Sequence, residues 1–434
     1  MLVVLLIAFF LRLGAATYWH RTAETEGRLF RLGDSHSYWT LASQLAQGLP
    51  YQYESPESRI FRAPLYPLVL APMAALSAPA VGVWWARVLG CLLGTLVVAE
   101  IAWLGWRCGG TAVAVIAAGL AAIYPSAIGM SIIVLSEAVF IPLMLGYLLA
   151  WQSAWQADSS KRRWGYGLLA GGLAGAAVLA RPSWLLFAPF VWGVAMLCGP
   201  DRRRQTLIFV STLAGLCCVM SPWWVRNATI TGRFVPTTLQ VGPSLLDGLH
   251  AGASGASDED MAFMQRLLAE QLLEDQRQSE PLVSTLEYRL NARAQTAAVD
   301  WAKDNPVEVL KLAGRKFLRI WTVWPAGGDV NSTLTRIAIT LSSFTVLLLA
   351  MRYSWLQTRC FSWFYVILWL PTLYFTLLHM VFVGSVRYRE PALLVLIPLA
   401  ACAVARWMHY AVERHATPRK GPHQGNGFAS NRPT

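Results

Sequence analysis

Apolar runs of membrane-spanning length alternate with short basic breaks along most of the chain. The runs lie at residues 1–19, 83–106, 111–129, 131–154, 165–180, 184–199, 205–224, 333–352, 361–383 and 391–410. They are apolar on all sides, and most are long enough to cross a hydrocarbon core of about 30 Å. The pattern predicts an all-α polytopic membrane protein of about ten transmembrane helices and excludes a barrel, whose strands are short and alternate.

Two long polar segments interrupt this pattern, at residues 20–82 and 225–332. Within the first, the apolar piece 64–77 is short and flanked by prolines, so we expect a re-entrant or interfacial half-helix. We divide the chain into an N-terminal transmembrane module (1–224, including the loop 20–82), a loop region (225–332), C-terminal transmembrane helices (333–410) and a disordered tail (411–434).

The second loop is helical in pattern. Residues 258–277 and 281–303 read as amphipathic helices, and Asn305 with Pro306 supplies an N-cap and a first-turn proline for a third helix over 307–324. That third helix mixes four cations with leucine, phenylalanine and tryptophan, a composition typical of a helix along the membrane interface.

Basic residues in the short loops predict the orientation. With ten spans counted, one side receives Arg107, Lys161 to Arg163, Arg202 to Arg204, Arg352 with Arg359, and the tail from Arg414 to Lys420. By the positive-inside rule that side is the cytoplasm, so both termini lie inside and both long loops outside. We expect the first run to be a retained span and not a cleaved signal, because Arg12 interrupts its apolar core.

The composition indicates which kinds of molecule the chain could bind. Apolar residues make up 55% of the chain and charged residues 14%, with a net charge of +12. Because the cations are dispersed among loops, they fit contact with anionic lipid and argue against nucleic acid. All seven cysteines lie in spans or at their cytoplasmic ends, so neither a disulfide framework nor a cysteine metal site is expected.

Only two carboxylates fall clearly within apolar runs, where a charge is costly and needs a reason. Glu137 is near the outer end of its span and therefore on the same side as Asp34 of the first loop. Glu100 is near the cytoplasmic end of its span, and we interpret it as the structural partner of an arginine.

Several short motifs follow one another along the chain in an order that can be compared with known families. They are Asp34 with Tyr38 and Ala42, Gly48 to Tyr51, Arg62 to Pro67, Leu135 to Glu137, Ala180 to Pro182, Ser221 to Asn227 followed by Gly232 to Phe234, and Arg387 to Pro391. Together they resemble GT-C fold membrane glycosyltransferases, in the branch of the protein O-mannosyltransferases and the lipid A aminoarabinose transferase. Each motif alone is weak, and the case depends on their order over residues 1 to 410.

The resemblance implies transfer of a sugar from a polyprenyl-phosphate carrier to a glycan, lipid or protein hydroxyl at the outer face, with inversion. A poor hydroxyl nucleophile needs a base, for which we choose Asp34, and the departing phosphate needs guanidinium groups. Arg62 is the first candidate for the phosphate, then Arg387 and Arg389, then Arg226. Glu137 is expected as a second catalytic carboxylate, and Tyr38, Tyr66 and Tyr388 as substrate contacts. A bacterial inner membrane is the expected location.

Other interpretations of these residues stay open. Asp34 is also a natural helix N-cap, with Gly48 ending that helix; Arg62 could meet lipid headgroups; and Glu137 could pair with Arg181. The mechanism requires no cofactor, and a divalent ion held by Asp34, His36 and Glu137 is a minority hypothesis.

Two other function classes compete with the transferase. A transporter would place acids and broken helices near the midplane and show internal symmetry, and neither is visible in the sequence. A noncatalytic or polymerase-type protein of lipid-linked glycan assembly would share the substrate, and the sequence distinguishes it less clearly from a transferase.

Overall fold

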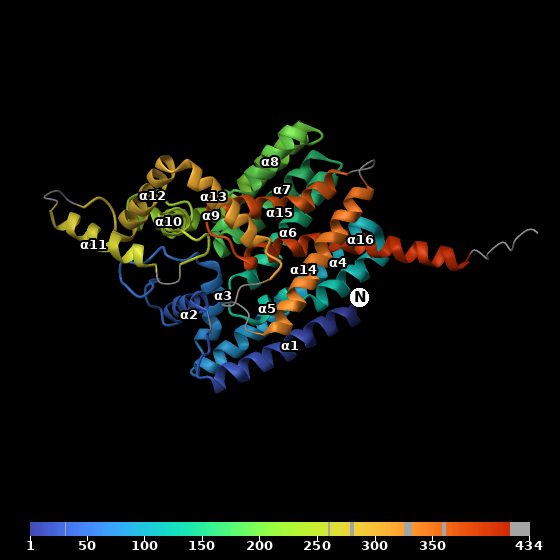
Figure 1. Cartoon of the computed structure of the whole chain (residues 1–434), viewed down its shortest axis with the longest axis horizontal. Helices are drawn as coiled ribbons and strands as arrows, with labels where there is room; N and C mark the ends of the chain where they lie inside the picture. The colour runs from blue at the N-terminus through green and yellow to red at the C-terminus, as the bar shows by residue number, and fades with distance from the viewer. Residues whose placement is uncertain (31, 259–260, 278–281, 325–331, 358–361, 417–434) are drawn as a thin grey trace, which may run out of the picture.

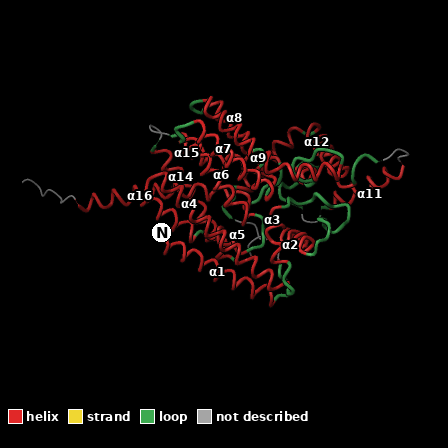
Figure 2. The backbone as a smooth tube through the Cα atoms, turned by 180° about the vertical axis from the view of Figure 1, so that it is seen from behind, coloured by secondary structure: helices red, strands yellow, loops and turns green. Residues whose placement is uncertain are grey.

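The computed structural model of the chain describes residues 1–30, 32–258, 261–277, 282–324, 332–357 and 362–416. Throughout this part of the chain every regular element is a helix, which confirms the all-α prediction (Figures 1 and 2). Arg359, Cys360 and residues 417–434 of the expected tail lie outside the described residues. The prediction of a disordered tail from residue 411 is wrong for residues 411–416, which continue the last helix to Ala416.

Seven helices in the described ranges are long and apolar enough to cross a membrane. They are α1 (Leu2–Thr25), α4 (Pro79–Ile123), α6 (Glu137–Gln156), α9 (Arg202–Thr231), α14 (Thr333–Leu356), α15 (Trp363–Val381) and α16 (Val386–Ala416). The chain is therefore a multi-pass membrane protein, but a count of ten is not confirmed. The expected spans 83–106 and 111–129 share α4, α7 (Ser160–Ala180) begins with a basic cluster, and α8 (Phe187–Cys198) has only 12 residues.

The long helix α4 is folded back on itself. Its backbone leaves the helical region at Gly109 and at Gly110, where φ is 77°, a value that favours glycine. Gly105 lies against Ala114 and Ala117 from the other side of this break, with no room for a Cβ. Two antiparallel arms result, and α5 (Pro125–Ile132) follows the second arm.

Arg12 explains why α1 packs on this hairpin. The side chain is fully buried, and its guanidinium donates to the carbonyl oxygens of Ala8, Ala121 and Ala122 and to the hydroxyl of Ser131. A cation inside a membrane helix is tolerated when its donors are satisfied in this way. Arg12 is thus a packing residue that joins α1 to the second arm of α4 and to α5.

Glu100, which was expected to pair with an arginine, does not do so among the described residues. Its Oε2 is buried without a hydrogen-bond partner in the described part of the chain, and the side chain lies against Gly146 of α6. The nearest basic residue along α4, Arg107, donates instead to Gln156 at 2.8 Å and Ser153 at 3.1 Å. Among the described residues Glu100 therefore has no arginine partner, because Arg107 donates to the neutral side chains of α6 instead.

The polar segments gather at the end of the bundle away from the N-terminus (Figure 1). They form α2 (Gly33–Ala46), α3 (Leu65–Ala74), α10 (Val241–Gly248), α11 (Ala262–Arg277), α12 (Leu286–Asp304) and α13 (Pro306–Ile320). The short helix near 64–77 and the three helices of the second loop are thereby confirmed. That loop begins later than residue 225, because α9 continues to Thr231 and ends at Gly232 with φ of 67°.

Glu287 of α12 ties the two polar segments together. Its carboxylate accepts hydrogen bonds from the backbone amides of Arg59 and Ile60, each at 2.9 Å, and the carbonyl of Ile60 accepts from the amide of Leu239 at 3.0 Å. The first long polar segment is thus fixed to the second, and the site described below lies beside this junction.

The helices α7 and α9 pack closely through glycine. A Cβ at Gly171 would lie 2.0 Å from the carbonyl oxygen of Thr212, and one at Gly167 would overlap Ser211. Gly175, one turn further along α7, faces Val219, one turn or more further along α9. Contacts that advance in the same direction on both helices show that α7 and α9 are parallel, so their N-termini lie at one end of the bundle.

Candidate active site

Asp34 lies in the first turn of α2, where its carboxylate does not cap the helix. The N-cap position is Leu32, and no side chain forms a cap hydrogen bond there, so the N-cap interpretation of Asp34 is wrong. The expectation that Gly48 ends this helix is correct, because α2 ends at Ala46 and Gly48 follows with φ of 69°. The carboxylate of Asp34 is therefore free to form ion pairs.

Arg62 spreads its guanidinium over three partners. One Nη pairs with Asp34 Oδ1 at 2.7 Å, the other donates to Gln240 Oε1 at 3.0 Å, and Nε donates to the hydroxyl of Ser37 at 3.2 Å. Its Cζ lies 5.2 Å from the ring centre of Tyr38, within cation–π range. Arg62 thus joins α2 to the segment that precedes α10.

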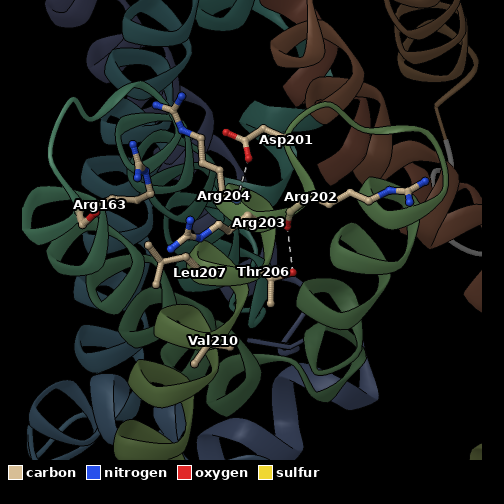
Figure 3. Close-up of a pocket in the computed structure, with 9 residues that line it drawn as sticks. Arg163, Asp201, Arg202, Arg203, Arg204, Thr206, Leu207 and Val210 are labelled. Atoms are coloured by element: carbon tan, nitrogen blue, oxygen red, sulfur yellow. Dashed lines mark hydrogen bonds between the residues drawn. The ribbon is translucent and has the colours of Figure 1, made fainter.

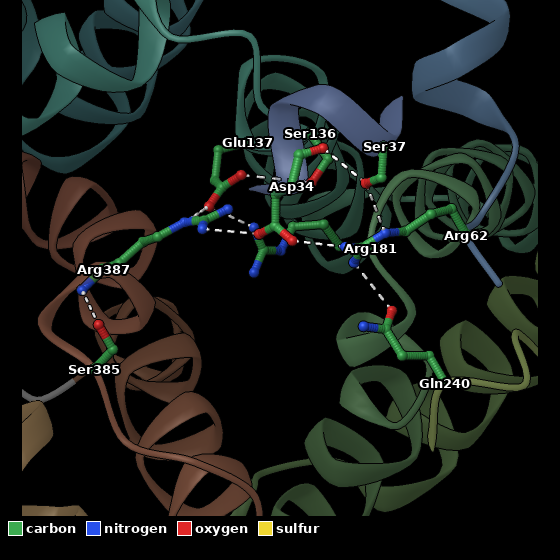
Figure 4. A network of polar contacts seen from close by, with 9 residues as sticks. All are labelled: Asp34, Ser37, Arg62, Ser136, Glu137, Arg181, Gln240, Ser385 and Arg387. Carbon is green, nitrogen blue, oxygen red and sulfur yellow. Dashed lines mark hydrogen bonds and ion pairs between the residues drawn. The ribbon is translucent and has the colours of Figure 1, made fainter. Parts of the chain in front are cut away.

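Arg387, at the start of α16, bridges the two carboxylates of the site. Its Nη1 pairs with Asp34 Oδ2 at 3.0 Å and its Nε with Glu137 Oε1. The same oxygen of Glu137 receives Arg181 Nη1 at 2.6 Å, so the interpretation that pairs Glu137 with Arg181 is confirmed. Figure 4 shows Asp34 between Arg62 and Arg387, with Glu137 on the Arg387 side.

The two carboxylates differ in access. The side chain of Asp34 is 35% exposed and that of Glu137 is 1% exposed. Three guanidinium groups against two carboxylates leave the cluster one positive charge. Burial raises the pKa of Asp34, but Arg62 and Arg387 lower it by more, so its pKa lies below the usual range. Asp34 is thus the carboxylate that a substrate can reach.

Tyrosine rings flank the cluster. The rings of Tyr38 and Tyr66 meet edge to face at 5.2 Å, with Tyr66 buried behind Tyr38. On the other side Tyr388 stacks on His379 at 4.0 Å with the rings parallel, and His379 donates to the carbonyl of Val383 at 3.1 Å. Of the three tyrosines expected as substrate contacts, Tyr38 lies beside Arg62 and Tyr388 directly follows Arg387, whereas Tyr66 is buried against Tyr38.

Two expected phosphate ligands lie elsewhere. Arg389 is 2% exposed and donates to the carbonyls of Ile320 and Thr322, each at 2.8 Å, so it holds the end of α13. Arg226 donates to the carbonyl of Arg59 at 3.2 Å and lies 4.7 Å from the ring centre of Trp223. Neither contacts Asp34 or Glu137 among the described residues.

The site also contains residues that were not expected as members. Arg181 was named only within the motif Ala180 to Pro182 and as a possible partner of Glu137, and Ser37 and Gln240 were not singled out. The signal for Arg181 is its place at the outer end of α7, directly before Pro182, on the same face as Glu137. Gln240 belongs to a loop with no periodic pattern, and nothing in the sequence marks it.

The residues proposed for a divalent ion do not form a ligand set. No group of three His, Cys, Asp or Glu side chains that could hold a metal occurs in the described ranges. His36 is exposed on α2 with its ring against Phe30, and both carboxylates already have guanidinium partners. Because two of the three proposed ligands are neutralised by arginine, this donor set does not fit a metal.

With this geometry established, comparison with known proteins extends the picture. No family model and no curated protein matches the chain. The apo oligosaccharyltransferase of Archaeoglobus fulgidus superposes with a TM-score of 0.57 at 16% identity, covering 95% of this chain and 52% of that one. The same enzyme, AglB, with an inhibitory peptide and a dolichol-phosphate, gives 0.53 at 15% identity, covering 91% and 49%.

A third structure, ArnT from Cupriavidus metallidurans bound to undecaprenyl phosphate, gives a TM-score of 0.41 at 16% identity, covering 96% of this chain and 80% of that one. The fold assignment rests on the oligosaccharyltransferase structures, of which this chain spans about half the length. The chain therefore has the fold of the GT-C membrane glycosyltransferases, as the motifs predicted.

Proposed function

We propose that this chain is a membrane glycosyltransferase that moves a sugar from a polyprenyl-phosphate donor to an acceptor hydroxyl at the outer face, with inversion. One observation carries the proposal: a half-exposed carboxylate, Asp34, is held between two arginines in a cluster of net positive charge at the loop-bearing end of the bundle. The oligosaccharyltransferase of the same fold was solved with dolichol-phosphate and a peptide, which supports a lipid-linked donor.

Asp34 acts on the acceptor. As the acceptor oxygen bonds to the anomeric carbon, its proton passes to Asp34, and the bond between the anomeric carbon and the phosphate oxygen breaks. A positioned carboxylate can accept this proton during bond formation. Because Asp34 is the exposed member of the pair, a glycan, lipid or protein hydroxyl can approach it, whereas Glu137 is covered.

Arg62 and Arg387 act on the donor. A polyprenyl-phosphate sugar carries one negative charge, and the leaving phosphate gains a second, which two guanidinium groups stabilise through charge-assisted hydrogen bonds. When these groups turn to the phosphate, Asp34 loses the cations that lower its pKa. Donor binding therefore strengthens the base, which is a weak one while both arginines pair with it.

Glu137 is a positioning residue in this scheme. Held at 2.6 Å by Arg181 and paired with the Nε of Arg387, it fixes the bridging guanidinium beside Asp34 without touching the substrate. Tyr38, beside Arg62, and Tyr388, next to Arg387 in the chain, are the proposed substrate contacts on either side of Asp34. Arg226 and Arg389, which were candidates for the phosphate, keep their structural contacts.

We further place the enzyme in a bacterial inner membrane with both termini in the cytoplasm. The basic residues of the short loops support this orientation by the positive-inside rule. Under it the Asp34 cluster faces the periplasm, where a lipid-linked sugar would be presented.

The test is transfer by the purified protein in nanodiscs, with radiolabelled polyprenyl-phosphate sugars and a panel of acceptors. Asp34→Asn should abolish transfer while donor binding persists, because the amide keeps the size but cannot accept the proton. Asp300→Asn, a carboxylate-to-amide change at an exposed position of α12, is the matched control and should transfer at the parent rate. Transfer by Asp34→Asn at the parent rate would remove Asp34 as the base.

The low pKa of Asp34 favours one competing function, a protein that binds lipid-linked glycan without reacting. Such a protein would bind the donor with the same arginines but transfer no sugar in any acceptor mixture. Donor affinity without transfer by the parent chain, in a lipid and acceptor extract that supports transfer by another enzyme, would select this alternative.

A further inference from the structure

A second arginine-rich feature lies far from Asp34. A hollow of about 900 Å³ opens where α7 and α9 begin (Figure 3). It is lined by four arginines, one carboxylate, two hydroxyl residues and two apolar residues: Arg163, Arg202, Arg203, Arg204, Asp201, Ser160, Thr206, Leu207 and Val210.

This hollow is on the other side of the membrane from the candidate active site. Arg181, which pairs with Glu137, directly follows the last residue of α7, and Ser160, which lines the hollow, is the first. The helix between them has 21 residues. At about 1.5 Å per residue it is about 30 Å long, the thickness of a hydrocarbon core. The hollow is therefore a separate feature of the opposite face.

Two of its arginines are held together without a neutralising acid. Arg163 and Arg204 both donate to the carbonyl oxygen of Ala157, at 2.7 and 3.2 Å, and the Nε atom of each is buried with no hydrogen-bond partner in the described chain. The carboxylate of Asp201 also lines the hollow, where it caps α9 by accepting a hydrogen bond from the amide of Arg204 at 3.0 Å, so four arginines against one carboxylate leave a net charge of +3.

The surroundings add to the positive potential. The four arginines form no ion pair with any described carboxylate. Since α7 and α9 are parallel, the positive ends of two helix dipoles also lie side by side. Arg163 and Arg204, which share one carbonyl acceptor, repel one another, and a bound anion would reduce that repulsion.

The apolar residues identify the kind of anion. Leu207 and Val210 lie on the first turns of α9, further along the helix into the bundle than the arginines, and Val210 is 46% exposed. A free phosphate would use only the arginines and leave these side chains uncovered. A lipid has a phosphate for the arginines and acyl methylenes for the apolar side chains, and basic pockets between membrane helices bind such headgroups.

We propose that this hollow binds the phosphate headgroup of an anionic phospholipid. The four arginines hold the phosphate, and Leu207 and Val210 contact the first methylenes of an acyl chain. The site is independent of the sugar-transfer proposal, because it uses none of the residues around Asp34.

Native mass spectrometry of the detergent-solubilised protein tests the site. The protein is titrated with phosphatidylglycerol, cardiolipin or phosphatidylcholine, alone and against inorganic phosphate. We expect the anionic lipids to bind at least about tenfold more tightly than phosphatidylcholine, and phosphate not to displace them. Equal binding of the zwitterionic lipid would overturn the proposal, as would complete displacement by phosphate, which would mean a free-anion site.

Two double variants and one control test whether lipid binding depends on the hollow or on the general surface charge. Arg163→Gln with Arg204→Gln removes the two inner arginines. Arg202→Gln with Arg203→Gln removes the two exposed ones, whose side chains form no described hydrogen bond, so the fold is kept. Each pair should weaken anionic lipid binding about tenfold.

The matched control is Lys161→Gln with Arg162→Gln, the same loss of charge on the first turn of α7 but outside the hollow. It should change binding by less than about twofold, because Lys161 and Arg162 do not line the hollow and so form no charge-assisted hydrogen bond with the bound phosphate. An equal loss in this control, or unchanged binding in the folded Arg202→Gln with Arg203→Gln variant, would refute the site.

Discussion

Replacing Glu137 with glutamine is the sharpest test of the ion-pair network. Glutamine keeps the volume and one acceptor oxygen but removes the negative charge that faces Arg181 at 2.6 Å and Arg387 beside it. Glu137 is 1% exposed, so the pairing belongs to the buried class, in which removal of one partner costs about 3–5 kcal/mol. Two guanidinium groups would lose their shared partner, and we expect Glu137→Gln to lower the free energy of unfolding by about that amount.

The free energy is measured by reversible unfolding in mixed dodecylmaltoside and SDS micelles. Glu308→Gln is the matched control: it breaks an ion pair with Lys311 on the exposed face of α13, and we expect no measurable change. Adding Arg181→Gln to Glu137→Gln should restore part of the loss, because it removes one uncompensated charge. A Glu137→Gln protein as stable as the Glu308→Gln control would show that the network does not hold the helices together.

Three further predictions concern other parts of the molecule. Arg62→Lys should weaken donor binding about tenfold in a titration with polyprenyl-phosphate sugar, since an ammonium cannot reach Asp34, Ser37 and Gln240 together; unchanged affinity would contradict the phosphate role. Burial raises the pKa of Glu287 from 4.5 to about 7, so its contribution to stability is full below pH 4.5 and is lost as the pH rises through 7; unfolding measured against pH should show this slope, and Glu287→Gln should lack it. Gly171→Ala should destabilise the protein by about 1–3 kcal/mol, because its Cβ would overlap Thr212, whereas Gly165→Ala, with open space around it, should not; equal stability of the two variants would refute the close packing of α7 and α9.

The sequence predicted which residues would meet more reliably than it predicted the number of spans. Asp34, Arg62, Glu137 and Arg387 were expected on one face because hydrophobic runs alternate the side of each loop, and the structure brings all four into direct contact. The number of spans was harder to predict, since α8 has only 12 residues and the two arms of α4 are separated by only a two-glycine break.

Contacts within the site were beyond sequence reasoning for a different reason. Arg389 was expected at the phosphate together with Arg387, as a member of the same motif, but residues two apart on a helix point to different sides. Arg389 accordingly faces the end of α13, while Arg387 faces Asp34. Gln240 reaches Arg62 from an irregular loop, and loops have no period from which a direction could be predicted.

The bridging position of Arg387 links the two halves of the proposed reaction. Its Nε is held by a buried carboxylate, Glu137, and its Nη1 by an exposed one, Asp34. A donor phosphate arriving from the open side can replace only the second contact, because Glu137 is covered. The guanidinium then keeps its position through Glu137 while Asp34 is released as a base. In the proposed reaction a site with a single carboxylate could not do both, so the scheme gives Glu137 a role that requires no contact with the substrate.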